Sequence, residues 1–327
     1  MKDYVIKDEL FSELMKGTAE LFLSERRREL RLPRDDGKAL YFVCYDAENA
    51  VGTVIISHGF TETAEKYPEV IYYFLIHRYN VCLPEHCGHG RSYRLVDDLS
   101  LVHIDSYERY VYDLLAAADV AKKEHPGLPL YVYGHSMGGG VAAAALSVKP
   151  ELFERAVLSS PMIRPLTGDI PWSMAKLLAN ILCLTGKSEQ YVPGGHAFDG
   201  NERFEDSAAT SRERFEYYQT KRCAEPLFQM SAASCGWLKE TAKLNHYLMK
   251  HGWKRIKTPL LIFRAQDDGF VSGTEQVRFA EKVSGAGKAS VTLKCTAGSR
   301  HEIFNSEWQV LENYWQQVFS FLCESDS

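Results

Sequence analysis

The chain has 327 residues, of which 45% are hydrophobic and 25% charged, values typical of a globular protein with a large core. The formal net charge of −5 does not favour long-range attraction to nucleic acid or to an anionic membrane. No segment reaches the roughly 18 apolar residues of a membrane span, and the N-terminal residues lack the apolar core of a signal peptide. Eight cysteines occur without a CxxC pair, and several lie in apolar runs where a thiol behaves as a small hydrophobe. We therefore expect a reduced, cytoplasmic protein.

The first half of the chain alternates short apolar runs with amphipathic stretches. In chain order we expect an amphipathic helix at residues 4–24, strands at 30–32, 40–45, 53–57, 80–83, 130–133 and 156–159, and helices at 67–79, 106–124 and 141–146. The first two strands flank a turn at residues 34–37 and are expected to form an antiparallel hairpin. The later strands alternate with helices, which is typical of a mostly parallel sheet covered on both faces.

Residues 161–256 interrupt this alternation. Helical patterns dominate there, at residues 172–184, 211–221 and 232–250, and glycines lie in the loops between them. Strands at 260–263 and 291–293 then resume the sheet, and a helix at 308–322 ends it. We therefore expect a core formed by residues 1–160 and 257–327, with residues 161–256 inserted as a helical cap.

The strongest functional signal follows the strand at residues 130–133. The sequence there contains G-x-S-x-G, with Gly134, Ser136 and Gly138 as its fixed positions. This motif is informative when it joins a strand to a helix, because the serine then lies on a sharp, strained turn. Glycines two residues to either side avoid steric clashes across that turn. Ser136 is the predicted nucleophile.

A serine nucleophile needs a base, and the base needs a third group that orients it. His301 follows the last expected strand, where a base would be positioned. The strand at 260–263 precedes two adjacent carboxylates, Asp267 and Asp268. Adjacent side chains on a loop cannot both face one imidazole, so one of them is expected to be solvated or to cap the next helix.

Acyl transfer also needs donors for the negative charge that develops on the carbonyl oxygen. The backbone N–H of Met137, directly after the nucleophile, is one candidate. The loop after the strand at residues 53–57 supplies the other, since Gly59 allows a tight turn and Phe60 can then present its N–H group.

Five segments of the sequence together resemble one known family. SHGFTE, EHCGHGRS, GHSMGGG, AQDDGFV and SRHEIF look like the lysophospholipase and monoacylglycerol lipase family. In the expected cap, YVPG and TSRERF are most similar to bacterial lysophospholipase L2 proteins. The resemblance covers most of residues 25–320.

The resemblance implies an α/β-hydrolase fold: a mostly parallel eight-stranded sheet with helices on both faces and an inserted helical cap. It assigns the acid to Asp268 rather than Asp267. It also places Glu85 where the family commonly has aspartate. The family needs no cofactor and no metal, and His86 and His89, without further ligands in their glycine loop, do not indicate a metal site.

The resulting hypothesis is a serine carboxylic ester hydrolase that cleaves the acyl ester of a lysophospholipid or monoacylglycerol through an acyl-enzyme on Ser136. The apolar helix at 172–184 is expected to line an acyl pocket or to contact a lipid surface, although ordinary packing of the cap on the core explains it equally well. Such contact would place the protein peripherally at the inner face of the membrane.

Two other enzyme classes remain open from the sequence, a broad-specificity carboxylesterase and an aminopeptidase-like amide hydrolase. The amide hydrolase would need an acidic cluster that binds an amine, for which Glu202, Glu205 and Asp206 are candidates. A non-catalytic binding protein is disfavoured because serine, acid and histidine are all present.

Overall fold

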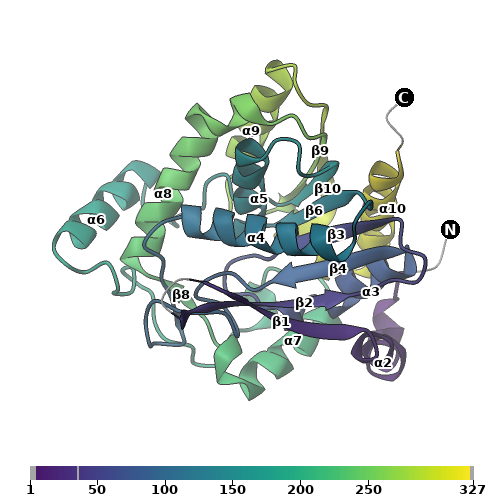
Figure 1. Cartoon of the computed structure of the whole chain (residues 1–327). Helices are drawn as coiled ribbons and strands as arrows, with labels where there is room; N and C mark the ends of the chain where they lie inside the picture. Colours follow the sequence, from purple (N-terminus) through teal and green to yellow (C-terminus); the bar gives the residue numbers. More distant parts are fainter. Residues whose placement is uncertain (1–4, 35–36, 325–327) are drawn as a thin grey trace.

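The main sheet of the protein has eight strands in the order β1-β2-β4-β3-β6-β7-β9-β10. It is seen in a computed structural model, of which residues 5–34 and 37–324 are described (Figure 1). The strands are β1 (Arg27–Pro33), β2 (Ala39–Tyr45), β3 (Gly52–Ser57), β4 (Tyr79–Pro84), β6 (Leu130–His135), β7 (Arg155–Ser159), β9 (Leu260–Asp267) and β10 (Val291–Arg300). β2 pairs antiparallel with β1 and β4, and all other neighbours pair parallel. The mostly parallel eight-stranded sheet predicted above is therefore confirmed.

Apolar side chains alternate between the two faces of this sheet and create two cores. Along β3, Ile55 belongs to one core, whereas Val54 and Ile56 belong to the other. The first core is covered by α4 (Glu108–Glu124), α5 (Met137–Val148), α8 (Cys235–Lys250) and α9 (Gly273–Gly285), and the second by α3 (Pro68–Ile76) and α10 (Trp308–Cys323). Helices therefore cover both faces, as continuous apolar strands require.

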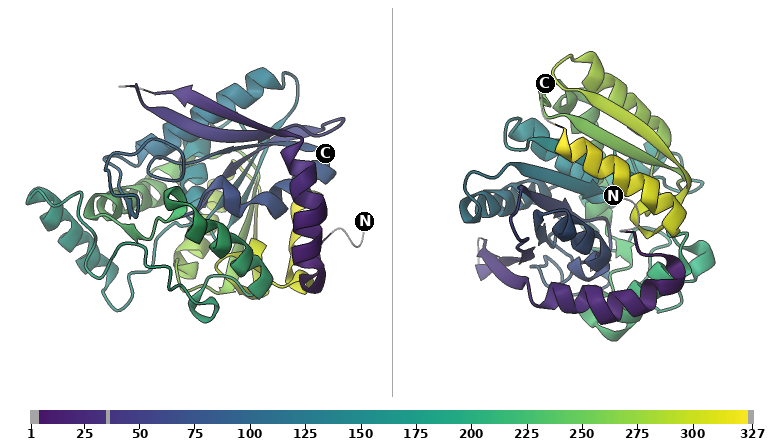
Figure 2. Two further views of the ribbon diagram at one scale, coloured as in Figure 1. Left: turned by 90° about the horizontal axis from the view of Figure 1, so that it is seen from below. Right: turned by 90° about the vertical axis from the view of Figure 1, so that its right-hand side faces the viewer.

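The N-terminal segment is helical from Asp8 to Ser24, with a π-helical turn at Met15–Ala19. Figure 2 shows it beside α10, and the backbone N–H of Trp308 donates to the Asp8 carboxylate. The predicted hairpin is confirmed as β1 and β2. Its expected turn at 34–37 includes residues 35 and 36, which lie outside the described part of the chain, as does residue 4 of the expected first helix.

The segment between β7 and β9 contains α6 (Trp172–Leu184), α7 (Arg212–Ala224), β8 (Ala232–Ala233) and α8. β8 pairs with β5 (Leu101–Val102) in a separate two-stranded sheet. α8 packs on the main body through Leu244 and Leu248, which lie in the same core as α5. α6 lies beside α8 at the margin of the molecule (Figures 1 and 2). Among the described residues, no helix combines the length and hydrophobicity needed to cross a bilayer.

The expectation that the cysteines are all reduced is wrong at one pair. Cys44 on β2 and Cys82 on β4 are joined by a disulfide, with their Cα atoms 4.3 Å apart. The antiparallel register places these two residues directly opposite each other, a relation between distant segments that cysteine spacing does not reveal. The other six cysteines are free.

Candidate active site

Ser136 lies at the sharp turn between β6 and α5. Its backbone has φ 51° and ψ −119°, a left-handed conformation that side chains other than glycine rarely adopt. The flanking glycines are needed for close packing. A Cβ at Gly138 would lie 2.0 Å from the carbonyl oxygen of Ser57, and one at Gly134 would lie 2.8 Å from the Cα of Gly139. The strained turn predicted from the G-x-S-x-G motif is present.

A chain of hydrogen bonds connects Ser136, His301 and Asp268. The Ser136 Oγ lies 2.7 Å from the Nε2 of His301, and the Nδ1 of the same ring lies 2.9 Å from the Asp268 Oδ2. The serine and histidine are each less than a tenth exposed. In this arrangement the imidazole can accept the serine proton while the carboxylate fixes the orientation of the ring.

The structure separates the two adjacent carboxylates. Asp267 is the exposed last residue of β9 and pairs in register with Arg300 of β10. Asp268 turns inward, where its Oδ1 accepts the backbone N–H groups of Phe270 and Val271 at 2.9 and 3.0 Å. Burial opposes ionisation of Asp268, but His301 and these two N–H groups outweigh it and hold the pKa of the carboxyl below its usual value. The helix that follows is capped by Ser272, so Asp267 is the solvated member of the pair.

Phe60 and Met137, the candidate oxyanion donors, come from two segments that the fold brings together. Met137 is the first residue of α5, and Phe60 follows β3 in a loop packed tightly against that helix. The contact is backbone to backbone, because a Cβ at Gly138 would also lie 2.4 Å from the carbonyl oxygen of His58. Phe60 and Ser136 line the same cavity. The geometry thus brings both segments to the serine.

Three buried histidines, His58, His86 and His89, pack at the loop that carries Phe60. The Nε2 of His58 accepts the backbone N–H of His86 at 2.8 Å, and the Nε2 of His86 lies 3.0 Å from the Ser57 Oγ. Burial lowers the pKa of His58 to about 4 and that of His86 and His89 well below the usual value. These rings are therefore neutral near pH 7. Within the described residues, no three His, Cys, Asp or Glu side chains are grouped to hold a metal ion.

Glu85 follows β4 and also holds the loops beside Phe60 through hydrogen bonds. Its Oε1 accepts the backbone N–H of Ala64 at 3.0 Å, and its Oε2 accepts that of Arg91 at 2.6 Å. Burial raises the pKa of Glu85 to about 7. The longer side chain therefore bridges two loops from a site that favours its protonated form.

A cavity of about 580 Å³ opens onto Ser136 and His301. The apolar residues of its lining include Phe60, Met162, Leu166, Trp237 and Phe270. The charged residues of the same lining include Lys66, Glu202, Arg222 and Glu302. The lining of the cavity is therefore amphiphilic.

A second, mostly apolar cavity of about 280 Å³ adjoins the first. Both are lined by Pro165, Leu166 and Trp237, and the second extends beneath the inner face of α6 along Ala179 and Leu182. Apolar lining residues therefore extend from the serine cavity into the segment between β7 and β9, and we refer to this apolar lining as the apolar path.

The three acidic residues considered as an amine-binding cluster, Glu202, Glu205 and Asp206, pair with three different arginines and do not face one site. Only Glu202 lines the cavity, where it pairs with Arg222. Glu205 pairs with Arg212 and Asp206 with Arg203, and both carboxylates are solvent-exposed. No concentrated negative charge faces the serine from this trio.

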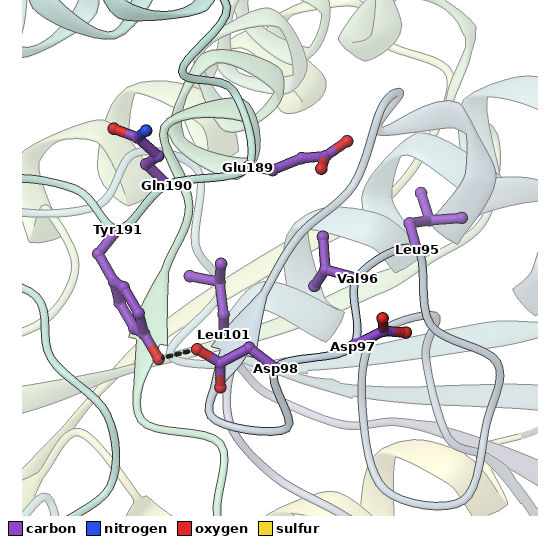
Figure 3. Close-up of a pocket in the computed structure, with 8 residues that line it drawn as sticks. All are labelled: Leu95, Val96, Asp97, Asp98, Leu101, Glu189, Gln190 and Tyr191. Carbon is purple, nitrogen blue, oxygen red and sulfur yellow. Dashed lines mark hydrogen bonds between the residues drawn. The ribbon is translucent and has the colours of Figure 1, made fainter.

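A separate hollow of about 640 Å³ is lined by neither Ser136 nor His301; Figure 3 shows the residues that line it. It lies between residues 95–101 and residues 189–191. The Tyr191 hydroxyl donates to Asp98 Oδ2 at 2.5 Å, which joins the two segments (Figure 3).

Apart from Glu202, the charged residues of the main cavity were missed by sequence reasoning. Glu62 and Glu302 lie in the motifs already singled out for Phe60 and His301, and Lys66 follows the first of these motifs by four residues. Their position within one to six residues of Phe60 or His301 is the signal that would have found them. Arg222 gives no such signal, because it lies on α7, far along the chain.

Comparison with known proteins gives the family. Residues 48–307 match the family model described as serine aminopeptidase, S33. Lysophospholipase L2 of Escherichia coli is 25% identical over 292 residues, which cover 88% of this chain and 84% of that protein. Monoacylglycerol lipase of Mycolicibacterium smegmatis is 26% identical over 273 residues, covering 83% and 89% respectively.

A solved structure gives the same fold. A soluble variant of monoglyceride lipase from Saccharomyces cerevisiae, crystallised with a substrate analogue, superposes with a TM-score of 0.70 at 17% identity and covers 92% of this chain and 96% of that one. The resemblance seen in the sequence motifs is therefore confirmed. Because the family model matches most of its length, this chain is a serine hydrolase that belongs to the family described as serine aminopeptidase, S33.

Proposed function

We propose that the chain hydrolyses the acyl ester of a monoacyl lipid, a lysophospholipid or a monoacylglycerol, with Ser136 as nucleophile. The observation that carries this proposal is the amphiphilic cavity. A monoacyl lipid has one apolar chain and one polar end, and the cavity at the serine is lined by both apolar and charged residues and adjoins a second, mostly apolar cavity. The names of the relatives, lysophospholipase L2 and monoacylglycerol lipase, support the same substrate class.

The proposed reaction has two steps. The Ser136 Oγ attacks the acyl carbonyl carbon while the Nε2 of His301 takes the serine proton, and Asp268 holds the ring in the required tautomer. The backbone N–H groups of Phe60 and Met137 stabilise the oxyanion. His301 then protonates the departing alcohol, and water, activated by the same ring, releases the fatty acid from the acyl-enzyme.

We further propose that residues 161–256 act as a cap whose outer surface contacts lipid. Met174, Leu177, Ile181 and Leu184 recur at helical spacing on one face of α6, and the last is 84% exposed. The opposite face of α6 lines the apolar path. An apolar face in water is costly, so contact with a lipid surface would both bury it and bring the substrate to the path.

A panel of esters tests the substrate proposal. With purified protein, kcat/KM should rise from acetyl to palmitoyl esters, and palmitoyl lysophosphatidylcholine or monopalmitoylglycerol should be cleaved faster than an aminoacyl anilide. A flat profile across chain lengths would favour a broad-specificity carboxylesterase. Preferential cleavage of the anilide would favour an amide hydrolase, although the dispersed acidic trio does not support that activity.

A further inference from the structure

Glu62 is a buried carboxylate, 2% exposed, that directly binds the loop carrying Phe60. Its Oε2 accepts the backbone N–H of Gly59 at 2.5 Å and the hydroxyl of Tyr67 at 2.5 Å. Gly59 directly precedes Phe60, and a Cβ there would lie 2.8 Å from the same carboxylate oxygen. The glycine and the glutamate therefore fit each other closely, and the carboxylate holds the peptide unit directly before the one that presents the Phe60 N–H.

The same carboxylate reaches the nucleophile turn through His135, the residue before Ser136. The Nδ1 of His135 lies 3.3 Å from the Glu62 Oε1, and its Nε2 lies 3.4 Å from the carbonyl oxygen of His301. The rings of His135 and His301 also pack with their centroids 5.0 Å apart. Glu62 is thus connected to the backbone of the base through one intervening side chain.

A second connection to the base runs through Lys66. Its Nζ lies 3.2 Å from the Glu62 Oε1 and also pairs with Glu302, the residue after His301. Glu302 is itself fixed, because its Oε2 accepts the Asn305 side-chain amide at 2.8 Å. One ammonium therefore joins the oxyanion loop to the loop that carries the base.

The charges in this network reinforce one another. Burial opposes ionisation of Glu62, but Lys66 and His135 outweigh it and hold the pKa of that carboxyl well below its usual value. Burial would likewise lower the pKa of Lys66, yet the carboxylates of Glu302 and Glu62 hold it above its usual value. The ion pairs are therefore formed across the neutral pH range.

We infer that Glu62 is a positioning residue that fixes the oxyanion loop and the histidine loop relative to Ser136. The inference rests on the proposed function, since it assigns Phe60 and His301 their roles in ester hydrolysis. Glu62 lines the same cavity as Ser136, but its polar contacts run to Gly59, His135 and Lys66, through which we expect it to act. Its loss should displace the Phe60 N–H and the imidazole by small distances, to which catalysis is far more sensitive than folding.

The test is Glu62→Gln, which keeps the size of the side chain but removes its charge. Glu65→Gln is the matched control. Glu65 is also partly buried and forms ion pairs, but its partners are Arg27 and Arg91 and not the oxyanion loop, the nucleophile turn or the loop that carries His301. Turnover of p-nitrophenyl butyrate and the rate of reaction with a fluorophosphonate are measured for both variants and the wild type, well below their unfolding temperatures.

We expect Glu62→Gln to lower kcat by about tenfold or more with KM within about twofold of wild type, the pattern of a lost transition-state interaction. Fluorophosphonate reaction should slow in parallel, because it uses the same serine and oxyanion site. Glu65→Gln should leave both rates unchanged. Unchanged kcat in Glu62→Gln, or an effect confined to KM, would overturn the inference.

Two further comparisons keep the result decisive. If Glu62→Gln does not fold, Glu302→Gln tests the same network at the more accessible carboxylate that pairs with Lys66. This variant should lower kcat by about threefold or more without changing KM. An unchanged kcat in Glu302→Gln would refute the inference. If wild-type protein does not react with the fluorophosphonate, the proposed function fails. If it reacts and Glu62→Gln reacts equally fast, only the positioning role fails.

Discussion

Replacing Asp268 with asparagine should cripple turnover for a reason that follows from its surroundings. The Asp268 Oδ1 accepts the backbone N–H groups of Phe270 and Val271. An asparagine must keep its carbonyl oxygen on that side, because its NH₂ group cannot accept a hydrogen bond. The NH₂ would then face the Nδ1 of His301, 2.9 Å from the present Oδ2, and force that nitrogen to be the acceptor. The proton would move to Nε2, which then cannot take the proton of Ser136.

The expected cost is therefore that of a wrong histidine tautomer, about 10⁴-fold in kcat for the analogous change in a serine protease, or roughly 5.5 kcal/mol of transition-state stabilisation. Initial rates with p-nitrophenyl butyrate measure it. Asp267→Asn is the matched control, since Asp267 is exposed and lies outside the hydrogen-bonded chain; its kcat should match wild type. A severe loss in Asp267→Asn, or retention of kcat within about tenfold in Asp268→Asn, would refute the assignment of the acid.

Three further predictions concern stability and substrate length. Between pH 4.5 and about 7, folded Glu85 keeps a proton that the unfolded chain releases. The contribution of this group to the free energy of unfolding therefore falls by up to about 3 kcal/mol as pH rises. Glu85→Gln should remove this pH dependence of stability in thermal unfolding from pH 5 to 8, and an unchanged pH dependence would contradict the reasoning. Arg214→Met leaves the carboxylates of Asp8 and Glu69 unpaired and should cost about 3–5 kcal/mol in denaturant unfolding, whereas a loss below about 1 kcal/mol would show that the pairing is unimportant. Ala179→Phe places a ring in the cavity beneath α6 and should lower kcat/KM for palmitoyl but not butyryl esters, an expectation that equal effects on both would exclude.

The sequence predicted those features that depend on local chemistry. The sharp turn at Ser136 follows from three fixed positions between a strand and a helix, and the position of His301 after the last expected strand then pointed to the base. Asp268 could not be distinguished from Asp267 by residue type, because both follow β9 and both are carboxylates. The family motif and the inward turn of the backbone after Asp267 distinguish them.

Features that depend on distant segments could not be predicted. The disulfide between Cys44 and Cys82 requires the register of β2 against β4. The network around Glu62 requires the loops after β3, β6 and β10 to meet. Nearness to the motifs marks Glu62, Lys66 and Glu302 one by one, but it does not reveal that their side chains pair with one another. The dispersal of Glu202, Glu205 and Asp206 likewise depends on which arginine lies beside each carboxylate.

The central claim is that Ser136 performs covalent catalysis, and site-specific labelling tests it most directly. Wild-type protein and Ser136→Ala are incubated with a fluorophosphonate, and each product is examined by intact mass and peptide mapping. We predict a single adduct on Ser136 in the wild type and none in Ser136→Ala, with both proteins folded alike. An unlabelled wild type, or an adduct at any other residue, would contradict the account.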